Sequence, residues 1–187
     1  MKSDRNPANS GLIQAEDCVL VIIDMQEKLL PVIAEREKVL SNIVKLIRFS
    51  RIMGLPVLVC EQNKLGPTVS EVQDELESYS PIPKDTFNCF GQDDFRAQLE
   101  QSGRKTLLLC GIEAHICVAQ TSLTAGADYR VHTVGDATSS RTLENAQAAT
   151  QRLLQSGVTV TTTEMCIFEL LQRAGTEEFK QAYKLVK

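Results

Sequence analysis

The chain of 187 residues carries 20 Lys and Arg against 24 Asp and Glu, a formal net charge of -4, and 43% of its residues are hydrophobic. These ordinary globular values exclude a disordered or fibrous chain and predict a single compact domain. Charges of both signs are interspersed and no apolar run is long enough to span a bilayer. Neither nucleic acid nor a membrane is therefore an expected partner.

The N-terminal residues are polar and lack the apolar core of a secretory signal peptide. We predict a flexible tail over residues 1–14, followed by one domain over residues 15–187. The chain has six cysteines, with no CxxC spacing and no histidines at zinc-finger distances, so reduced thiols in the cytoplasm are the expectation. They are Cys18, Cys60, Cys89, Cys110, Cys117 and Cys166.

The first half of the domain opens with an apolar, β-branched run over residues 18–23, which is typical of a strand buried on both faces. Apolar residues at helical spacing predict a helix over 35–53, and a second strand follows over 57–60. Between residues 61 and 90 the periodicity weakens to a short helix over 69–76 and an extended, proline-constrained segment. An irregular stretch of this length inside a compact domain is more often functional than idle.

The second half of the domain alternates regularly between apolar runs and amphipathic stretches. Strands are predicted at 106–110, 130–134 and 158–161, and helices at 94–101, 115–125, 143–155, 164–174 and 177–184. Right-handed βαβ units of this kind build a parallel sheet between two layers of helices. We therefore predict a three-layer α/β/α domain.

Ligands of open α/β sheets bind beyond the carboxyl ends of the strands, so the residues that follow each strand are the candidates for a site. Asp24 directly follows the first apolar strand. A desolvated carboxylate acquires the raised pKa that a general base near neutral pH requires. The alternative is that Asp24 caps the next helix, which would leave Gln26 unexplained.

Two further side chains have the chemistry of a site. Cys117 is expected in the first turn of the helix over 115–125, where peptide dipoles lower the pKa of a thiol and free N–H groups can receive an oxyanion. The alternative is a small buried hydrophobic side chain. Lys84 lies in a proline-constrained loop among aromatic residues, where it can pair with a carboxylate or stabilise a thiolate. The alternative is a solvated surface lysine.

Five segments of the chain together resemble the isochorismatase-like cysteine hydrolases, the superfamily that includes the nicotinamidases. They are VIIDMQ, PKDTFNCF, GIEAHICVAQT, DATSSR and TTTEMCIFEL, in the family's order over nearly the whole domain. The resemblance implies a six-stranded parallel sheet in the order 3-2-1-4-5-6. It also implies a catalytic triad of Asp24, Lys84 and Cys117, a cis peptide between Ile112 and Glu113, and an oxyanion hole made by the amides of Glu113 and Cys117.

The resemblance further implies a reaction. Asp24 takes the proton of Cys117, the thiolate attacks a carbonyl, an amine leaves, and water hydrolyses the thioester. We therefore predict cleavage of an amide-like C–N bond in a small molecule whose identity the sequence does not name. The residues expected to line the substrate pocket are Gln26, Glu61, Phe87, Phe90 and Ile112.

Two departures separate the chain from named branches of that superfamily. Nicotinamidases hold a metal with an Asp-x-His pair and further histidines, whereas only His115 and His132 occur here, so no metal and no cofactor are expected. Isochorismatases proper cleave a vinyl ether without a cysteine nucleophile, and Cys117 argues against that reaction. The segment EQNKLGPT is closest to an uncharacterised branch of the superfamily.

Functions of other classes stay open on the residues alone. Cys117 would also suit a peroxide-sensitive redox thiol, although no resolving cysteine is evident, and a catalytically idle binding scaffold is a third hypothesis. A nucleotide-binding Rossmann protein is disfavoured because no GxGxxG follows a strand. For His115 we expect a structural hydrogen bond. We also expect a homo-oligomer, in which an exposed apolar helix over residues 167–171 pairs with another copy.

Overall fold

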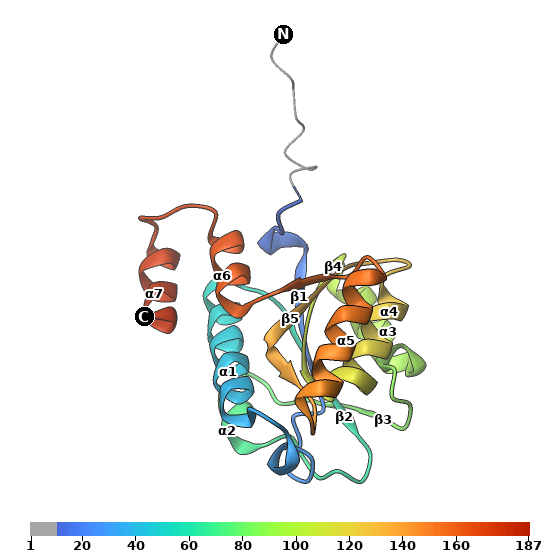
Figure 1. Cartoon of the computed structure of the whole chain (residues 1–187). Helices are drawn as coiled ribbons and strands as arrows, with labels where there is room; N and C mark the ends of the chain where they lie inside the picture. The colour runs from blue at the N-terminus through green and yellow to red at the C-terminus, as the bar shows by residue number, and fades with distance from the viewer. Residues whose placement is uncertain (1–10) are drawn as a thin grey trace.

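The computed structural model describes residues 11–187, and in this range it contains one sheet of six parallel strands in the order β3-β2-β1-β4-β5-β6 (Figure 1). The predicted fold class and strand order are therefore confirmed. The strands are β1 (Cys18–Ile23), β2 (Val57–Gln62), β3 (Ile82–Lys84), β4 (Thr106–Ile112), β5 (Arg130–Ser139) and β6 (Thr159–Thr161).

Helices cover both faces of the sheet. In Figure 1, α1 lies against one face with α6 and α7 beside it, and α3, α4 and α5 lie on the other. The short helix α2 contacts α1. The helices are α1 (Arg36–Met53), α2 (Ser70–Gln73), α3 (Asp93–Ser102), α4 (Ala119–Ala125), α5 (Leu143–Gln155), α6 (Thr163–Leu171) and α7 (Glu177–Val186).

The central strand β1 explains why its sequence reads as one continuous apolar run. Its even-numbered residues join the core beneath α1, α6 and α7, and its odd-numbered residues join the core beneath α3, α4 and α5. Every residue of the strand is buried. Successive side chains of a strand point to opposite faces, so a strand covered on both faces must be apolar throughout.

Local sequence sets the ends of several helices. Thr142, Thr162 and Thr176 each accept a backbone N–H of the first helical turn, and so cap α5, α6 and α7. Helix α1 ends at Gly54, which has a φ of 66° and adopts the left-handed conformation that glycine tolerates best.

The edge strand β3 is the element that periodicity does not predict. It has three residues, and Pro83 at its centre has no N–H to donate to a further strand, which suits an edge position. Ile82 and Lys84 are buried while Pro83 is exposed. The strand therefore turns a lysine side chain into the protein interior.

Strand β5 extends to Ser139, five residues beyond its predicted end at Val134. Its pairing with β4 shifts register: Thr133 pairs with Leu109, whereas Thr138 pairs with Gly111. The extra residues of β5 form a bulge opposite Cys110, and pairing resumes at Gly111. The DATSS segment, which reads as a loop after a strand, is thus part of the sheet.

The predicted tail over residues 1–14 ends too late. Residues 1–10 lie outside the described part of the chain, but Ile13 is fully buried in the core beneath α1. The Ile13 amide donates to Glu169 Oε2 at 3.4 Å, and the Gln172 side chain donates to Gln14 Oε1. The folded domain therefore begins before residue 15.

The expectation of an exposed apolar helix over residues 167–171 is largely wrong, because that stretch of α6 is already packed within the subunit. Ile167, Leu170 and Leu171 are buried, and the exposed large apolar side chain in the stretch is Phe168. An amphipathic helix directs most of its apolar residues to its own core.

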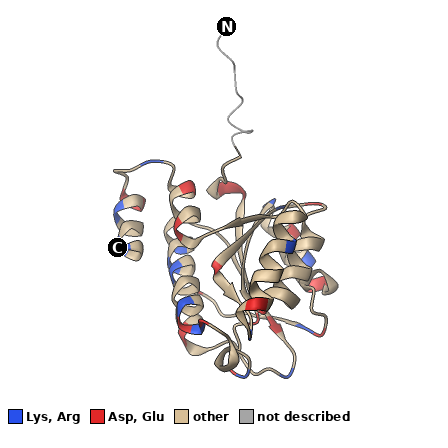
Figure 2. Ribbon diagram, viewed as in Figure 1, with Lys and Arg blue, Asp and Glu red and all other residues tan. Residues whose placement is uncertain are grey.

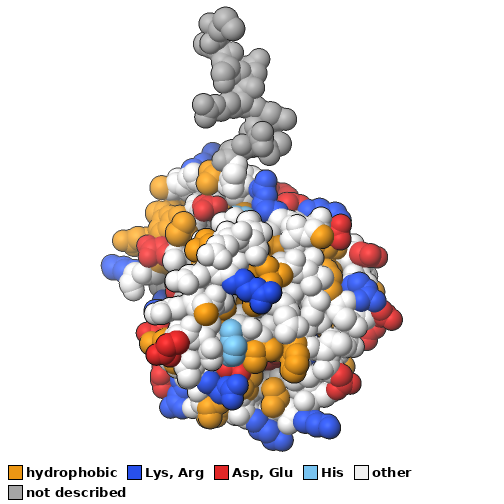
Figure 3. All heavy atoms as spheres, turned by 45° about the vertical axis from the view of Figure 1, so that its right-hand side comes forward, with side chains coloured by type: hydrophobic (Ala, Val, Ile, Leu, Met, Phe, Trp, Pro, Cys, Tyr) orange, Lys and Arg blue, Asp and Glu red, His pale blue; other side chains and the backbone are white. Residues whose placement is uncertain are grey.

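Charged side chains of both signs are distributed over the surface. Both signs occur on the helices in Figure 2, and they are mixed around the rim of the face in Figure 3. Within residues 11–187, no helix has the length and apolar character needed to cross a bilayer.

Candidate active site

Three neighbouring strands and one helical turn deliver polar side chains to the carboxyl end of the sheet. Asp24 follows β1, Lys84 ends β3 and Gln62 ends β2, which lies between those two strands. Cys117 lies in a π-helical turn, Ala114–Val118, that follows β4 on the other side of β1. This is the end of the sheet where open α/β folds bind ligands.

The three predicted triad side chains meet. Lys84 Nζ lies 2.9 Å from Asp24 Oδ2 and 3.6 Å from Cys117 Sγ. Asp24 is 0% exposed, Lys84 1% and Cys117 6%. The predicted convergence is therefore present, while the catalytic role of the three groups stays a prediction.

The ion pair of Asp24 and Lys84 is buried, and burial dominates its electrostatics. Desolvation raises the pKa of Asp24, opposed by the charge of Lys84 and by hydrogen bonding from Cys117. Burial by itself lowers the pKa of Lys84, but the charges of Asp24 and Cys117 raise it above its usual value on balance. Asp24 Oδ1 has no hydrogen-bond partner of standard geometry among residues 11–187. The attraction of Lys84 therefore offsets part of the desolvation cost of the Asp24 carboxylate, and Oδ1 is an oxygen able to take a proton.

The Cys117 thiol differs from the expectation for a helix start. Burial raises its pKa well above the usual range, the negative charge of Asp24 raises it further, and Lys84 opposes both. The amides of Ile116 and Val118 both donate to the Glu113 carbonyl oxygen. The bond from Val118 spans five residues, which is the spacing of a π-helical turn. The expected lowering of the thiol pKa is not found, because burial and the charge of Asp24 both raise it.

The predicted cis peptide between Ile112 and Glu113 is present. The Glu113 side chain is buried, and its carboxylate accepts the backbone N–H of Arg141 at 2.9 Å and Arg141 Nε at 3.1 Å. This bridge joins the residue after the cis bond to the segment that follows β5. Residue 113, whose amide is predicted to belong to the oxyanion hole, is therefore anchored by its own side chain. The role of that amide stays a prediction.

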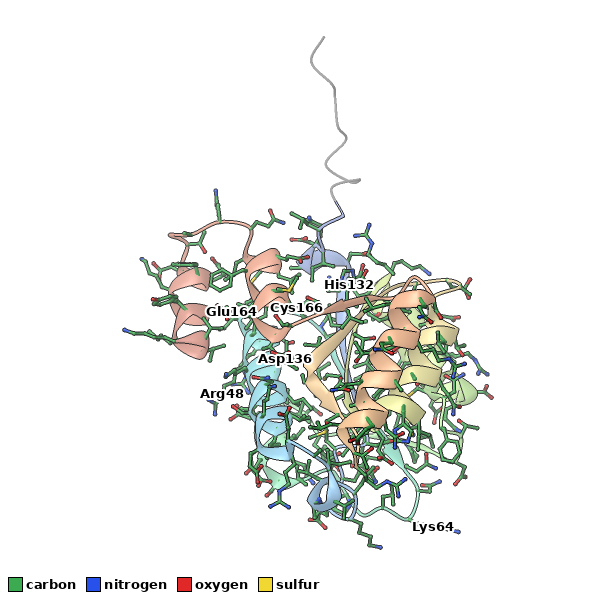
Figure 4. The ribbon with its side chains drawn as sticks, viewed as in Figure 1. Arg48, Lys64, His132, Asp136, Glu164 and Cys166 are labelled. Atoms are coloured by element: carbon green, nitrogen blue, oxygen red, sulfur yellow. The ribbon has the colours of Figure 1, made fainter. Side chains whose placement is uncertain are left out.

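The two histidines lie outside the cluster of Asp24, Lys84 and Cys117. His115 Nδ1 lies 2.9 Å from Ser140 Oγ, which is the structural hydrogen bond expected for it. His132 is buried near the start of β5, and Figure 4 shows it toward the opposite end of the molecule from Lys64, which lies in the loop after β2. Burial lowers the pKa of His132.

Several predicted pocket residues have structural tasks instead. The Gln26 side chain is closed to solvent and bonds to the backbone of Gln62 in both directions, at 2.8 and 2.9 Å. Glu61 Oε1 accepts the amide and the hydroxyl of Thr68. Ile112 is fully buried. Gln26 and Ile112 therefore do not line an open pocket, and Glu61 is committed to the neighbouring loop.

The two aromatic residues predicted for the pocket differ from one another. Phe87 is 53% exposed, whereas Phe90 is half-buried against the rings of Phe95 and Tyr129. Phe87 is thus free to contact a ligand, and Phe90 is part of the packing beneath α3. A substrate contact for either ring stays a prediction.

Gln62 is the polar residue of the cluster that sequence reasoning missed. Its Oε1 accepts Lys84 Nζ at 2.9 Å. Parity along β2 would have found it, since Leu58 and Cys60 face the core that contains Cys117, and Gln62 is the next residue on that side. Glu61, chosen from the sequence, faces the other way.

Two more thiols, Cys60 and Cys89, are buried close to the cluster. A hydrogen bond between them raises the pKa of Cys60 and lowers that of Cys89. Both thiols also feel the charges of Lys84 and Asp24. No group of His, Cys, Asp and Glu within residues 11–187 is arranged to hold a metal ion.

A family model described as "Isochorismatase domain" matches residues 18–165, a range that includes every member of the cluster. The chain belongs to the isochorismatase family. Members of this family are generally hydrolases, so a hydrolytic role is the coarse functional reading of the chain.

Relatives and solved structures agree with the family assignment. The "Secreted isochorismatase effector Isc1" of Phytophthora sojae is 35% identical over 95% of this chain and 88% of its own length. The structure of "MAR1 Ribonuclease" from Caenorhabditis elegans has a TM-score of 0.87 and 31% identity, covering 94% of this chain and 92% of its own. An Escherichia coli protein described as "an octameric hydrolase of unknown specificity" has a TM-score of 0.87 at 21% identity, covering 94% and 90%. The last likeness concerns the fold alone.

Proposed function

We propose that this isochorismatase-family protein is a cysteine-dependent hydrolase that cleaves an amide-like C–N bond of a small molecule through a thioester. The observation that carries the proposal is the convergence of one ammonium on a carboxylate and a thiol, with Lys84 Nζ 2.9 Å from Asp24 Oδ2 and 3.6 Å from Cys117 Sγ. A nucleophile beside a general base, with a third group holding the geometry, is the arrangement that covalent hydrolysis requires.

The pKa shifts of Cys117 and Asp24 support this chemistry. The pKa of Cys117 is raised, so the resting group is a neutral thiol. The pKa of Asp24 is also raised, which makes this carboxylate a stronger proton acceptor than an exposed one. When the proton passes from sulfur to Asp24, the ammonium of Lys84 compensates the new negative charge on the sulfur. The nucleophile therefore forms at the moment of attack.

The remaining steps conserve atoms and charge. Cys117 Sγ forms a bond to the substrate carbonyl carbon, whose oxygen becomes an oxyanion held by the amides of Glu113 and Cys117. The C–N bond breaks as Asp24 returns its proton to the leaving amine. Water then attacks the thioester, gives a proton to Asp24 and releases a carboxylic acid, and the thiol is restored.

The almost complete burial of the three side chains favours a small substrate over a macromolecule. The Caenorhabditis elegans relative is called a ribonuclease, but the net charge of -4 and the mixed surface charge of this chain do not favour a polyanion. We therefore propose neither nucleic acid nor membrane as a partner. RNA serves as a control substrate in the test below.

Assembly and compartment are part of the same proposal. By analogy with the octameric Escherichia coli protein, we propose that this chain forms a homo-oligomer. Its six cysteines are all unpaired, which favours a reducing compartment such as the cytoplasm. The Phytophthora sojae relative is called secreted, so fractionation of the source cells is the direct test of the compartment.

The test is turnover by Cys117→Ala protein. A panel of small amides, ureides and esters is screened with the wild-type protein by release of ammonia or acid, with RNA as a substrate expected to remain intact. We expect Cys117→Ala to lower turnover of any substrate found by about a thousandfold or more, because the covalent intermediate cannot form. Cys18→Ala, which removes a buried thiol distant from the cluster, is the matched control and should keep its activity. Turnover by Cys117→Ala at the wild-type rate would contradict the proposal.

A redox function receives less support from the same cluster. Peroxide reacts with thiolates, whereas the raised pKa of Cys117 keeps its sulfur protonated in the resting protein. Mass spectrometry after mild peroxide separates the two functions, since a redox protein would form a sulfenic acid at Cys117 and recycle with thiols. A binding scaffold would show neither that oxidation nor turnover of any panel member.

A further inference from the structure

The Lys84 ammonium has three hydrogen-bond partners, one for each of its N–H groups. They are Asp24 Oδ2 at 2.9 Å, Gln62 Oε1 at 2.9 Å and Cys117 Sγ at 3.6 Å. An ammonium has three donors and no acceptor, so these contacts use its whole capacity. Since the nitrogen is tetrahedral, two anchored N–H groups determine the direction of the third.

Gln62 is itself held on both of its amide atoms. Its Oε1 can only accept from Lys84, and its Nε2 donates to the backbone carbonyl of Asp85 at 3.1 Å. A donor on one side and an acceptor on the other leave one possible orientation of the amide. The Gln26 side chain fixes the backbone of Gln62 through both its N–H and its C=O.

We propose that Gln62 is a positioning residue of this site: its amide oxygen, together with Asp24, orients the Lys84 ammonium so that one N–H points at the Cys117 sulfur. The inference rests on the proposed function in naming what the orientation serves. Without the second anchor, the ammonium would turn about its Cε–Nζ bond and keep only the strong contact to Asp24. The sulfur would lose the donor that stabilises its anion.

A neutral amide suits this position better than a carboxylate. A glutamate in place of Gln62 would anchor the ammonium equally well, but it would add a second negative charge beside the sulfur. Like charges disfavour ionisation, so the thiolate would become harder to form. The residue can therefore orient the lysine without opposing the nucleophile.

The test is the pH dependence of alkylation of Cys117 by iodoacetamide in Gln62→Met, which keeps the side-chain length and removes the amide. The modified peptide is measured by mass spectrometry, and the other five thiols are at most 1% exposed against 6% for Cys117. We expect the profile to move to higher pH by about one unit, so that alkylation at a given pH is about tenfold slower.

Gln73→Met is the matched control, because Gln73 also holds the loop after β2 through its amide, by donating to the Thr68 carbonyl. This variant should lose some stability and keep the wild-type alkylation profile. Simple loosening of the site by Gln62→Met would expose the thiol and speed its alkylation. The expected slowing therefore has the opposite sign to a merely structural effect.

A second measurement asks whether Gln62 acts through Lys84. In a Lys84→Met background, Gln62→Met should have no further effect on alkylation. The inference is overturned by an unchanged or faster rate in Gln62→Met, or by equal slowing with and without Lys84. If Lys84→Met does not fold, the comparison with Gln73→Met still decides. Alkylation needs no substrate, so a failure of the hydrolase proposal would appear in Cys117→Ala turnover and leave this test intact.

Discussion

Single residues in this site owe their properties to burial. Asp24 and Cys117 both have raised pKa values, and desolvation is the largest cause in each. The two groups also act on one another, since the carboxylate charge makes the neighbouring thiol harder to ionise. The proposed reaction therefore depends on moving one proton between Asp24 and Cys117. The positive charge of Lys84 balances the one negative charge that these two groups share.

This coupling gives opposite expectations for two measurements on Asp24→Asn. Removing the carboxylate charge lowers the pKa of Cys117, so a larger fraction of the thiol is ionised at neutral pH and alkylation by iodoacetamide is faster, by about tenfold for each pKa unit. Hydrolysis should fall by about a hundredfold or more, because no base remains to exchange the proton.

Asp85→Asn is the control for that variant, because Asp85 follows Lys84 in the chain but is exposed. Solvent screens an exposed carboxylate, so both rates should stay near wild type. Slower alkylation of Asp24→Asn would show that Asp24 stabilises the thiolate instead of opposing it, and the proton transfer to Asp24 would have to be abandoned.

Among the elements, the carboxyl end of β4 brings the thiol side of the site to the carboxylate side. Gly111 pairs with Ile23 of β1 in the register of the sheet and has a φ of 115°. A Cβ at this position would lie 2.0 Å from the Ile23 carbonyl oxygen. The two strands can approach here because the residue has no side chain.

Gly111→Ala should therefore destabilise the fold strongly, by about 3 kcal/mol or more in the free energy of unfolding, from the backbone clash and the unfavourable φ together. Gly157→Ala is the control: it has a φ of 81° but open space around the position, so about 1 kcal/mol is expected from the backbone conformation alone. Urea unfolding of both variants measures the difference. If both variants lost the same free energy of unfolding, the close approach of β4 to β1 would not contribute to the cost of Gly111→Ala.

The whole molecule leaves a group of large apolar side chains exposed on α6 and α7. Met165, Phe168 and Tyr183 are each exposed by 41% or more. Phe179 links two of these side chains, with its ring centroid 6.5 Å from that of Phe168 and 5.8 Å from that of Tyr183. The exposed rings of Phe168 and Tyr183 are thus connected through Phe179, and contiguous exposed apolar groups mark interaction surfaces.

We accordingly expect light scattering to give a particle mass that is a multiple of the 20.7 kDa chain. Phe168→Asp should lower that mass, because a charge at a buried contact is costly to desolvate. Leu154→Asp, at a position on α5 that is exposed by 54%, should leave it unchanged. A wild-type mass of one chain at micromolar concentration would rule out the proposed oligomer.

Much of the fold follows from local sequence. The apolar run of β1, the glycine after α1 and the alternation of strands and helices each reflect a local rule, because burial on two faces and helix termination depend on nearby residues. The family motifs add the identities of Asp24, Lys84 and Cys117, since residues at strand ends must meet where parallel strands end.

Tertiary structure alone decided the features that depend on distant neighbours. The edge strand β3 has too few residues for periodicity, and its pairing with β2 is what makes it a strand. The rise in the pKa of Cys117 comes from burial beside Asp24, far away in sequence. The choice of Gln62 over Glu61 rests on which face of β2 turns toward Lys84. The sequence determines which side chains are present and in what order. Their desolvation, and the direction in which each side chain points, are set only when the chain has folded.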